Sequence, residues 1–117
     1  MLKGFKPGKI IVVCGRTDMR QGIDGLSSIV SHKYNLDLFD DTLFLFCGIR
    51  SDRIKGLYWS DNGFVLLYKR LEEGSFRWPR SKAEAKEISP QQYEWLMNGF
   101  EIEVRNKPIE TKGLVIT

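Results

Sequence analysis

Two strand-like runs that meet at an asparagine–glycine pair constrain the fold more than any other feature of this sequence. The runs are RIKGLYWS at 53–60 and FVLLYKRL at 64–71, and Asn62-Gly63 lies where they meet. An Asn-Gly pair between β-rich runs is among the strongest short-range signals of a tight hairpin turn. The sequence therefore predicts an antiparallel pair of strands at 53–60 and 64–71.

The turn also predicts the register of the two strands, because side chains alternate between the faces of a sheet and the loop fixes which residues are opposite. With Asn62-Gly63 as a two-residue loop, Trp59 lies opposite Leu66. In the same register Leu57 lies opposite Tyr68.

A second turn extends the hairpin into a meander. Glu72-Glu73-Gly74 suits a three-residue loop with glycine at the left-handed position, which predicts a third strand at 75–79. One face then collects most of the aromatic side chains and becomes the core: Leu57, Trp59, Phe64, Leu66, Tyr68, Phe76 and Trp78. Lys69 and Arg77 share the opposite face, with Arg70 at the rim. A two-residue second loop would instead move Phe76 and Trp78 across the sheet.

The first half of the chain predicts two buried strands with a helix between them. KIIVVCG at 9–15 and TLFLFCG at 42–48 are short apolar runs closed by glycine, and the second is apolar enough to be covered on both faces. Between them, apolar residues recur with helical spacing over 18–32. Thr17 or Asp18 is the expected cap of this helix. Arg16 and Arg20 are expected to project from its start rather than to enter the core.

The second half ends in a short helix. Residues 80–87 are a charged connector with no strand pattern, and SPQQYEWLMNGF follows at 89–100. Ser89 is the predicted N-cap, Pro90 the first helical residue and Gly99 the stop. The apolar stripe of this helix consists of Tyr93, Leu96 and Met97. A short strand is expected at 101–105.

These elements predict a small single-domain α+β fold: an antiparallel β-meander sheet packed against an N-terminal helix, with a short C-terminal helix. The 117 residues, 42% of them hydrophobic, suffice for one compact core. We assign the domain to 1–105 and a C-terminal tail to 106–117. Neither a membrane span nor a signal peptide is evident, which predicts a cytoplasmic protein without a membrane partner. Cys14 and Cys47 fit buried hydrophobes better than a disulfide.

The charge of the chain is segmental. Residues 1–20 carry five basic and one acidic side chain, and residues 50–80 carry seven basic and four acidic. Together with the aromatic residues of 50–80, this distribution suits an acidic partner such as nucleic acid, although a solvated surface and a core give the same composition.

Catalytic signatures are scarce. One histidine and two separated cysteines have no metal-ligand spacing, and no phosphate-binding or nucleophile motif occurs. The aspartates that resemble nuclease metal ligands are better explained as turn and cap residues: Asp18, Asp24, Asp40 and Asp41. We therefore expect a protein that is not an enzyme and that uses no cofactor or metal.

Four motifs in order along residues 10–100 closely resemble the TnpB accessory proteins, products of the second open reading frame, of the insertion-sequence sixty-six family of bacterial transposable elements. They are GRTDMRQGIDGL, LFLFCG, DRIKGLYWSDNGFVLLYKRLEEGSFRWP and ISPQQYEWLMNGF. The resemblance implies a role beside a separate transposase and a second accessory protein of the same element, and it supplies no catalytic residue.

Combining residues and resemblance, we predict a noncatalytic accessory protein of insertion-sequence transposition that contacts DNA through a basic hairpin surface. The alternative is a protein-only adaptor that recruits or stabilises the transposase. The candidate residues for binding nucleic acid or a partner are basic: Arg16, Arg20, Arg53, Lys55, Lys69, Arg70, Arg77 and Arg80.

Overall fold

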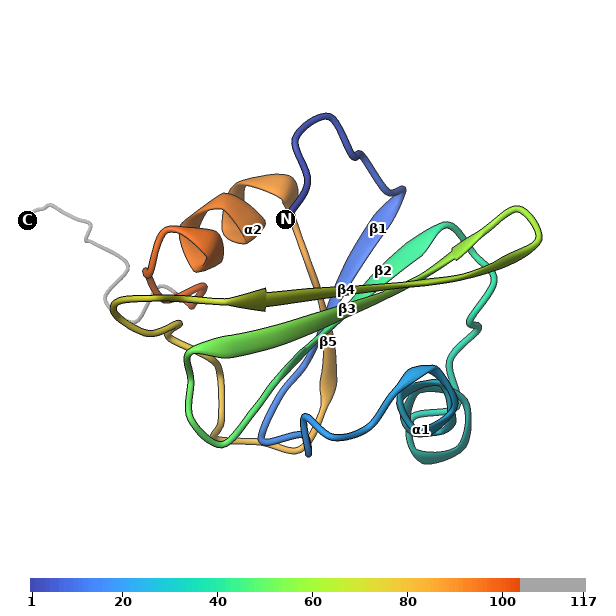
Figure 1. The fold of residues 1–117 in the computed structure, drawn as a ribbon, viewed down its shortest axis with the longest axis horizontal. Coiled ribbons are helices and arrows are strands. Elements are labelled where there is room, and N and C mark those ends of the chain that lie inside the picture. Colours follow the sequence, from blue (N-terminus) through green and yellow to red (C-terminus); the bar gives the residue numbers. More distant parts are fainter. Residues whose placement is uncertain (104–117) are drawn as a thin grey trace, which may run out of the picture.

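A five-stranded mixed sheet forms the centre of the protein in a computed structural model that describes residues 1–103 (Figure 1). The strands lie in the order β4-β3-β2-β1-β5. Their bounds are β1 Lys9–Val13, β2 Thr42–Cys47, β3 Arg53–Ser60, β4 Gly63–Arg70 and β5 Ala85–Ile88. β1 and β2 are parallel, and the other neighbouring pairs are antiparallel. The predicted α+β single domain is confirmed. Its sheet is mixed, and its antiparallel meander consists of β2, β3 and β4 rather than of the predicted strands at 53–60, 64–71 and 75–79.

Helices cover both faces of the sheet (Figure 1). On one face lies α1 (Ile23–Ser28), continued by the π-helical turn η1 (Ile29–Lys33). On the other lies α2 (Pro90–Met97), whose predicted cap is confirmed: the Ser89 hydroxyl accepts a hydrogen bond from the Gln92 backbone N–H, and the Gln92 side chain accepts one from the Ser89 backbone N–H. The sheet is thus the middle layer of three.

Two apolar clusters flank the sheet, because the inner strands are apolar on both faces. All six residues of β2 are buried, as its sequence predicts. The cluster under α2 has as its buried members Ile10, Val12, Cys14, Leu43, Leu45, Cys47, Ile54, Phe76, Trp78, Ile88, Leu96 and Ile102. The cluster under α1 contains Ile11, Val13, Leu26, Val30, Phe44, Phe46 and Leu57. Burial raises the pKa of both cysteine thiols to about 11, so they are protonated at neutral pH.

The hairpin between β3 and β4 is present, but its predicted register was wrong. The two-residue loop is Asp61-Asn62, since Ser60 pairs with Gly63. Asp61 has a φ of 54°, a left-handed conformation that aspartate tolerates, so the turn does not need glycine in its loop. Trp59 consequently lies opposite Phe64 rather than Leu66, and Leu57 opposite Leu66 rather than Tyr68. A shift of two residues leaves every side chain on its predicted face.

The third strand predicted at 75–79 does not form. After β4 the chain turns under the loop at 48–52, where Phe76 donates its backbone N–H to the Ser51 carbonyl at 2.7 Å. Phe76 and Trp78 are buried as expected, but in the cluster under α2 rather than beside Leu57. The Trp78 indole N–H donates to the Val13 carbonyl at 3.0 Å, which anchors this segment on β1.

The prediction that residues 80–87 form a connector without a strand was also wrong in part. Residues 85–88 form β5, which pairs with β1. Two of its four residues, Ala-Lys-Glu-Ile, are charged, so the sequence pattern does not indicate a strand. Of the strand predicted at 101–105, residues 101–103 are not in a strand, and the remainder lies outside the described residues.

The first helix begins later than predicted. Its N-cap position is Gly22, and no side chain caps it. Thr17 is instead buried and donates its backbone N–H to the Cys47 carbonyl at 2.9 Å. Asp18 accepts hydrogen bonds from Arg20. Arg16 and Arg20 are exposed as expected, but they project from the loop before the helix.

Candidate nucleic-acid interface

The loops that follow β1 and β2 lie together, because parallel neighbouring strands end at the same edge of a sheet. The backbone bond between Thr17 and Cys47 joins them. Their packing leaves no room for a side chain at Gly48, where a Cβ would lie 2.6 Å from the Met19 Cγ. Lys55 on β3 holds the loop after β1 in place, because its ammonium donates to the Met19 carbonyl at 2.6 Å and to the Gln21 carbonyl at 2.9 Å.

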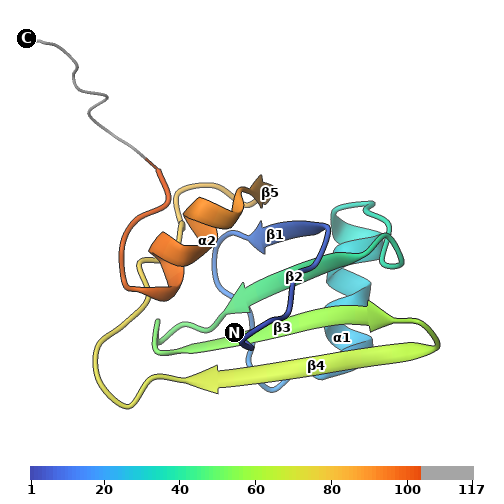
Figure 2. The same cartoon turned by 90° about the horizontal axis from the view of Figure 1, so that it is seen from above.

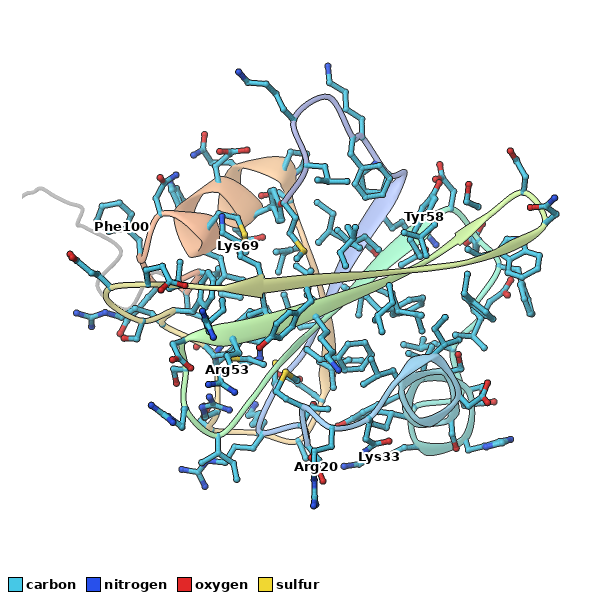
Figure 3. All side chains as sticks on the ribbon, viewed as in Figure 1. Arg20, Lys33, Arg53, Tyr58, Lys69 and Phe100 are labelled. Atoms are coloured by element: carbon cyan, nitrogen blue, oxygen red, sulfur yellow. The ribbon has the colours of Figure 1, made fainter. Side chains whose placement is uncertain are left out.

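Arginines gather around these two loops. One hollow of about 440 Å³ is lined by Arg16, Arg20, Arg50 and Arg53, together with the loop backbone. Arg70 lies beside this group, because it is directly opposite Arg53 in the pairing of β3 with β4. We call this set of five side chains the arginine end: Arg16, Arg20, Arg50, Arg53 and Arg70. Figure 3 shows two of them, Arg20 and Arg53, on the side of the sheet where α1 lies.

Three members of the arginine end have carboxylate partners. Arg20 forms a bidentate ion pair with Asp18, in which its Nη2 lies 2.7 Å from Oδ2 and its Nε lies 3.1 Å from Oδ1. This pairing lowers the pKa of Asp18 to about 2. Arg70 pairs with Glu72 at 3.1 Å, and Arg53 lies 3.7 Å from Asp52.

The other two members have no such partner. The side chains of Arg16 and Arg50 are exposed and make no hydrogen bond or ion pair with other residues in the described part of the chain. Like charges held close together are unfavourable unless solvent or an anion relieves them. Arg16 and Arg50 are therefore the guanidinium groups most available to an anionic ligand.

Two candidate residues have structural tasks. Lys55 binds loop carbonyls, as described, and its ammonium also lies 5.8 Å from the centre of the Tyr68 ring. Arg80 donates to the Gly15 carbonyl at 2.7 Å, the Gly48 carbonyl at 2.5 Å and the Ser51 hydroxyl at 2.9 Å. Both cations hold loops of the arginine end in place.

The remaining two candidates lie elsewhere. Lys69 is on the opposite face of the sheet, near the first residues of the chain and α2, as Figure 3 shows. Arg77 lies in the segment after β4, 3.8 Å from Glu101. The expectation that both lie on one sheet face was wrong, because residue 77 is not in a strand. The arginines thus gather around the loops at 14–22 and 48–52, and the hairpin contributes Arg53 and Arg70; a binding role for this surface stays a prediction.

Arg50 was missed by the sequence reasoning, although a signal was present. The order strand, helix, strand over 9–48 is that of a β-α-β unit, in which the two strands are parallel. Their following loops must then meet at one edge, which brings Arg50 in CGIRSD next to Arg16 in CGRTDM.

The two most distinctive sequence motifs contact each other at this edge. Gly15 of GRTDMR donates its backbone N–H to the carbonyl of Pro79, the last residue of KRLEEGSFRWP, at 2.9 Å. Trp78 and Arg80 bind carbonyls of Val13 and Gly15 from the same side. The motifs are thus joined in space as one structural unit.

Residues 1–103 contain neither a cluster of metal-binding side chains nor a membrane-spanning helix. Within 1–103, His, Cys, Asp and Glu form no group of three or more that could hold a metal ion. None of the helices in that range is long and apolar enough to span a membrane.

Fold and site define a small α+β protein with a concentrated arginine surface. A family model described as IS66 Orf2 like protein matches residues 8–107, so the chain belongs to that family, as its motifs indicate. Membership supports a role in IS66 transposition.

Two relatives from Sinorhizobium fredii (strain NBRC 101917 / NGR234) match most of the chain. The uncharacterized protein y4jC is 32% identical over 103 residues, covering 87% of this chain and 88% of its own length. The uncharacterized protein y4hO is 36% identical over 102 residues, covering 86% and 88%. No solved structure matches the chain.

Proposed function

We propose that this protein is a noncatalytic accessory protein of IS66 transposition that contacts DNA through the arginine end. It acts in the cytoplasm with the transposase and the second accessory protein of its element. The observation that carries the proposal is the hollow shared by Arg16, Arg20, Arg50 and Arg53. Family membership supports the transposition role, and the chemistry of the arginine end supports the choice of DNA.

Guanidinium groups suit phosphate because their planar N–H groups bind two oxygens at once. The arginines come from both loops and both hairpin strands, so they cover a surface rather than a single point. DNA offers phosphates at regular intervals and can engage several of them together. Backbone contacts of this kind carry affinity without sequence preference.

The test is a titration of the protein with element-end and unrelated duplexes at two salt concentrations. Replacing Arg16 and Arg50 with glutamine should leave folding intact and weaken binding to both duplexes. The dependence of log K on log salt should flatten by about one unit for each phosphate that the variant no longer binds.

Matched controls separate a local contact from a general loss of charge. Lys3→Gln with Lys6→Gln removes the same charge from exposed positions beside α2, and it should change binding less. Lys69→Gln with Arg77→Gln tests the two candidates that lie away from the arginine end.

Unchanged DNA binding in the Arg16 and Arg50 variant would contradict the proposal. If that variant also failed to capture the transposase in a pull-down, the protein-only adaptor would be the better account.

A further inference from the structure

The two edges of the sheet are built differently. β5 is four residues long, and its middle residues are Lys86 and Glu87, features that protect an edge strand from pairing with another chain. β4 is eight residues long, and its sequence GFVLLYKR has five consecutive apolar residues at 64–68. Figure 2 shows β4 as the outermost strand on its side of the sheet. This edge lacks the charges that protect β5 until its last two residues.

β4 has the composition of an interior strand. Phe64, Leu66 and Tyr68 point to the α1 face, and Val65 and Leu67 to the α2 face, so the strand is apolar on both sides. The interior strand β2 shows the same pattern and is completely buried. In β4, by contrast, Val65 remains 41% exposed and Tyr68 54% exposed. A further strand beside β4 would extend both apolar layers.

The charges near the ends of β4 are complementary to each other. Asp61 lies in the turn before the strand, where its side chain makes no hydrogen bond or ion pair with described residues, while Lys69 lies near the strand's end. An antiparallel copy of the same strand reverses this polarity. In such a pair, the negative end of each strand lies beside the positive end of the other, so two complementary contacts form.

We propose that β4 pairs antiparallel with β4 of a second copy of this protein, joining the two sheets into one of ten strands. Val65 faces the second copy's Val65 on the two-fold axis, which keeps the apolar faces aligned because opposite residues share a face. In this register Asp61 of each copy lies beside the second copy's Lys69. The edge backbone groups that β3 leaves unpaired bond across the axis. This inference is independent of the proposed function.

Sedimentation of the purified full chain over a range of concentrations tests the pairing. The wild type should be dimeric and dissociate on dilution. Val65→Lys places two ammonium groups against each other on the axis and should give a monomer with an unchanged far-UV circular dichroism spectrum. Ile49→Lys, at a side chain that is 71% exposed in the loop before β3 and outside the β4 edge, is the matched control and should remain dimeric.

A charge swap tests the register. Asp61→Lys should raise the dimer dissociation constant, and adding Lys69→Asp should lower it again. Hydrogen exchange should show amides of β4 that are protected in the wild type and exchange rapidly in the Val65→Lys protein. A monomeric wild type, or a dimer that survives Val65→Lys, would overturn the pairing; failure of the swap to restore association would overturn the register.

Discussion

At the scale of single residues, Arg80 shows how a cation can be structural on a basic surface. Its guanidinium holds carbonyls of Gly15 and Gly48 and the Ser51 hydroxyl, which belong to different loops. Arg80→Ala should lower the free energy of unfolding by about 2 kcal/mol or more, because partly buried acceptors lose a charged donor. Urea denaturation measures this loss.

Arg77→Ala is the control for Arg80→Ala, because Arg77 is exposed and its ion pair with Glu101 is long, at 3.8 Å. Its effect should stay within about 0.5 kcal/mol. Equal losses in the two variants would show that Arg80 does not bind the loops as described.

The sequence could not distinguish structural cations from available ones, because Arg16, Lys55 and Arg80 are all cations in basic segments. Their roles depend on which carbonyls the folded loops bring within reach. The side chain of Lys55 donates to two carbonyls of the loop after β1, whereas that of Arg16 reaches no carbonyl within residues 1–103. Residue type thus indicates which segments are rich in cations, and the path of the loops decides which of those cations remain available.

At the scale of elements, the segment from 71 to 84 has no regular structure and is held by two buried aromatic side chains. Phe76 and Trp78 contact each other edge to face, with ring centroids 6.5 Å apart. Trp78→Ala should cost about 3–5 kcal/mol, since it removes a buried indole and its bond to the Val13 carbonyl. That loss approaches the whole stability of an ordinary domain.

Trp78→Phe separates packing from hydrogen bonding, because it keeps an aromatic ring and removes only the N–H donor. Its cost should lie between those of wild type and Trp78→Ala in thermal or urea unfolding. A cooperative Trp78→Ala protein with wild-type stability would mean that this side chain is not part of the core.

Elements with strong local signals were predicted well, and elements set by distant contacts were not. β2 follows from its apolar run, and the start of α2 follows from Ser89 and Pro90. However, the strand beside β1 is formed by residues 85–88, two of which are charged, while Phe76 and Trp78 pack on a face of the sheet. Periodicity identifies an apolar segment but cannot say whether it pairs at an edge or packs on a face.

At the scale of the whole molecule, β1 and β2 contribute alternate side chains to both apolar clusters. Ile10 and Val12 lie under α2, while Ile11 and Val13 lie under α1. Neither cluster can lose its packing without disturbing the strands that the other requires. The division of the chain at 105 and 106 stays a prediction, but residues 1–103 have the architecture of one cooperative unit.

We therefore expect the two faces to unfold together. Trp59, which packs against Phe39 and Phe64 at centroid distances of 4.9 and 5.0 Å, reports one end of the hairpin on the α1 side. Trp78 and Trp95 report the α2 side. A Trp59→Phe protein and a Trp78→Phe, Trp95→Phe protein thus isolate the two fluorescence signals. Within each variant, the urea transitions followed by fluorescence and by far-UV circular dichroism should coincide. A separate, earlier fluorescence transition in either variant would show that one cluster melts while the sheet persists, and that the shared strands do not couple the two faces.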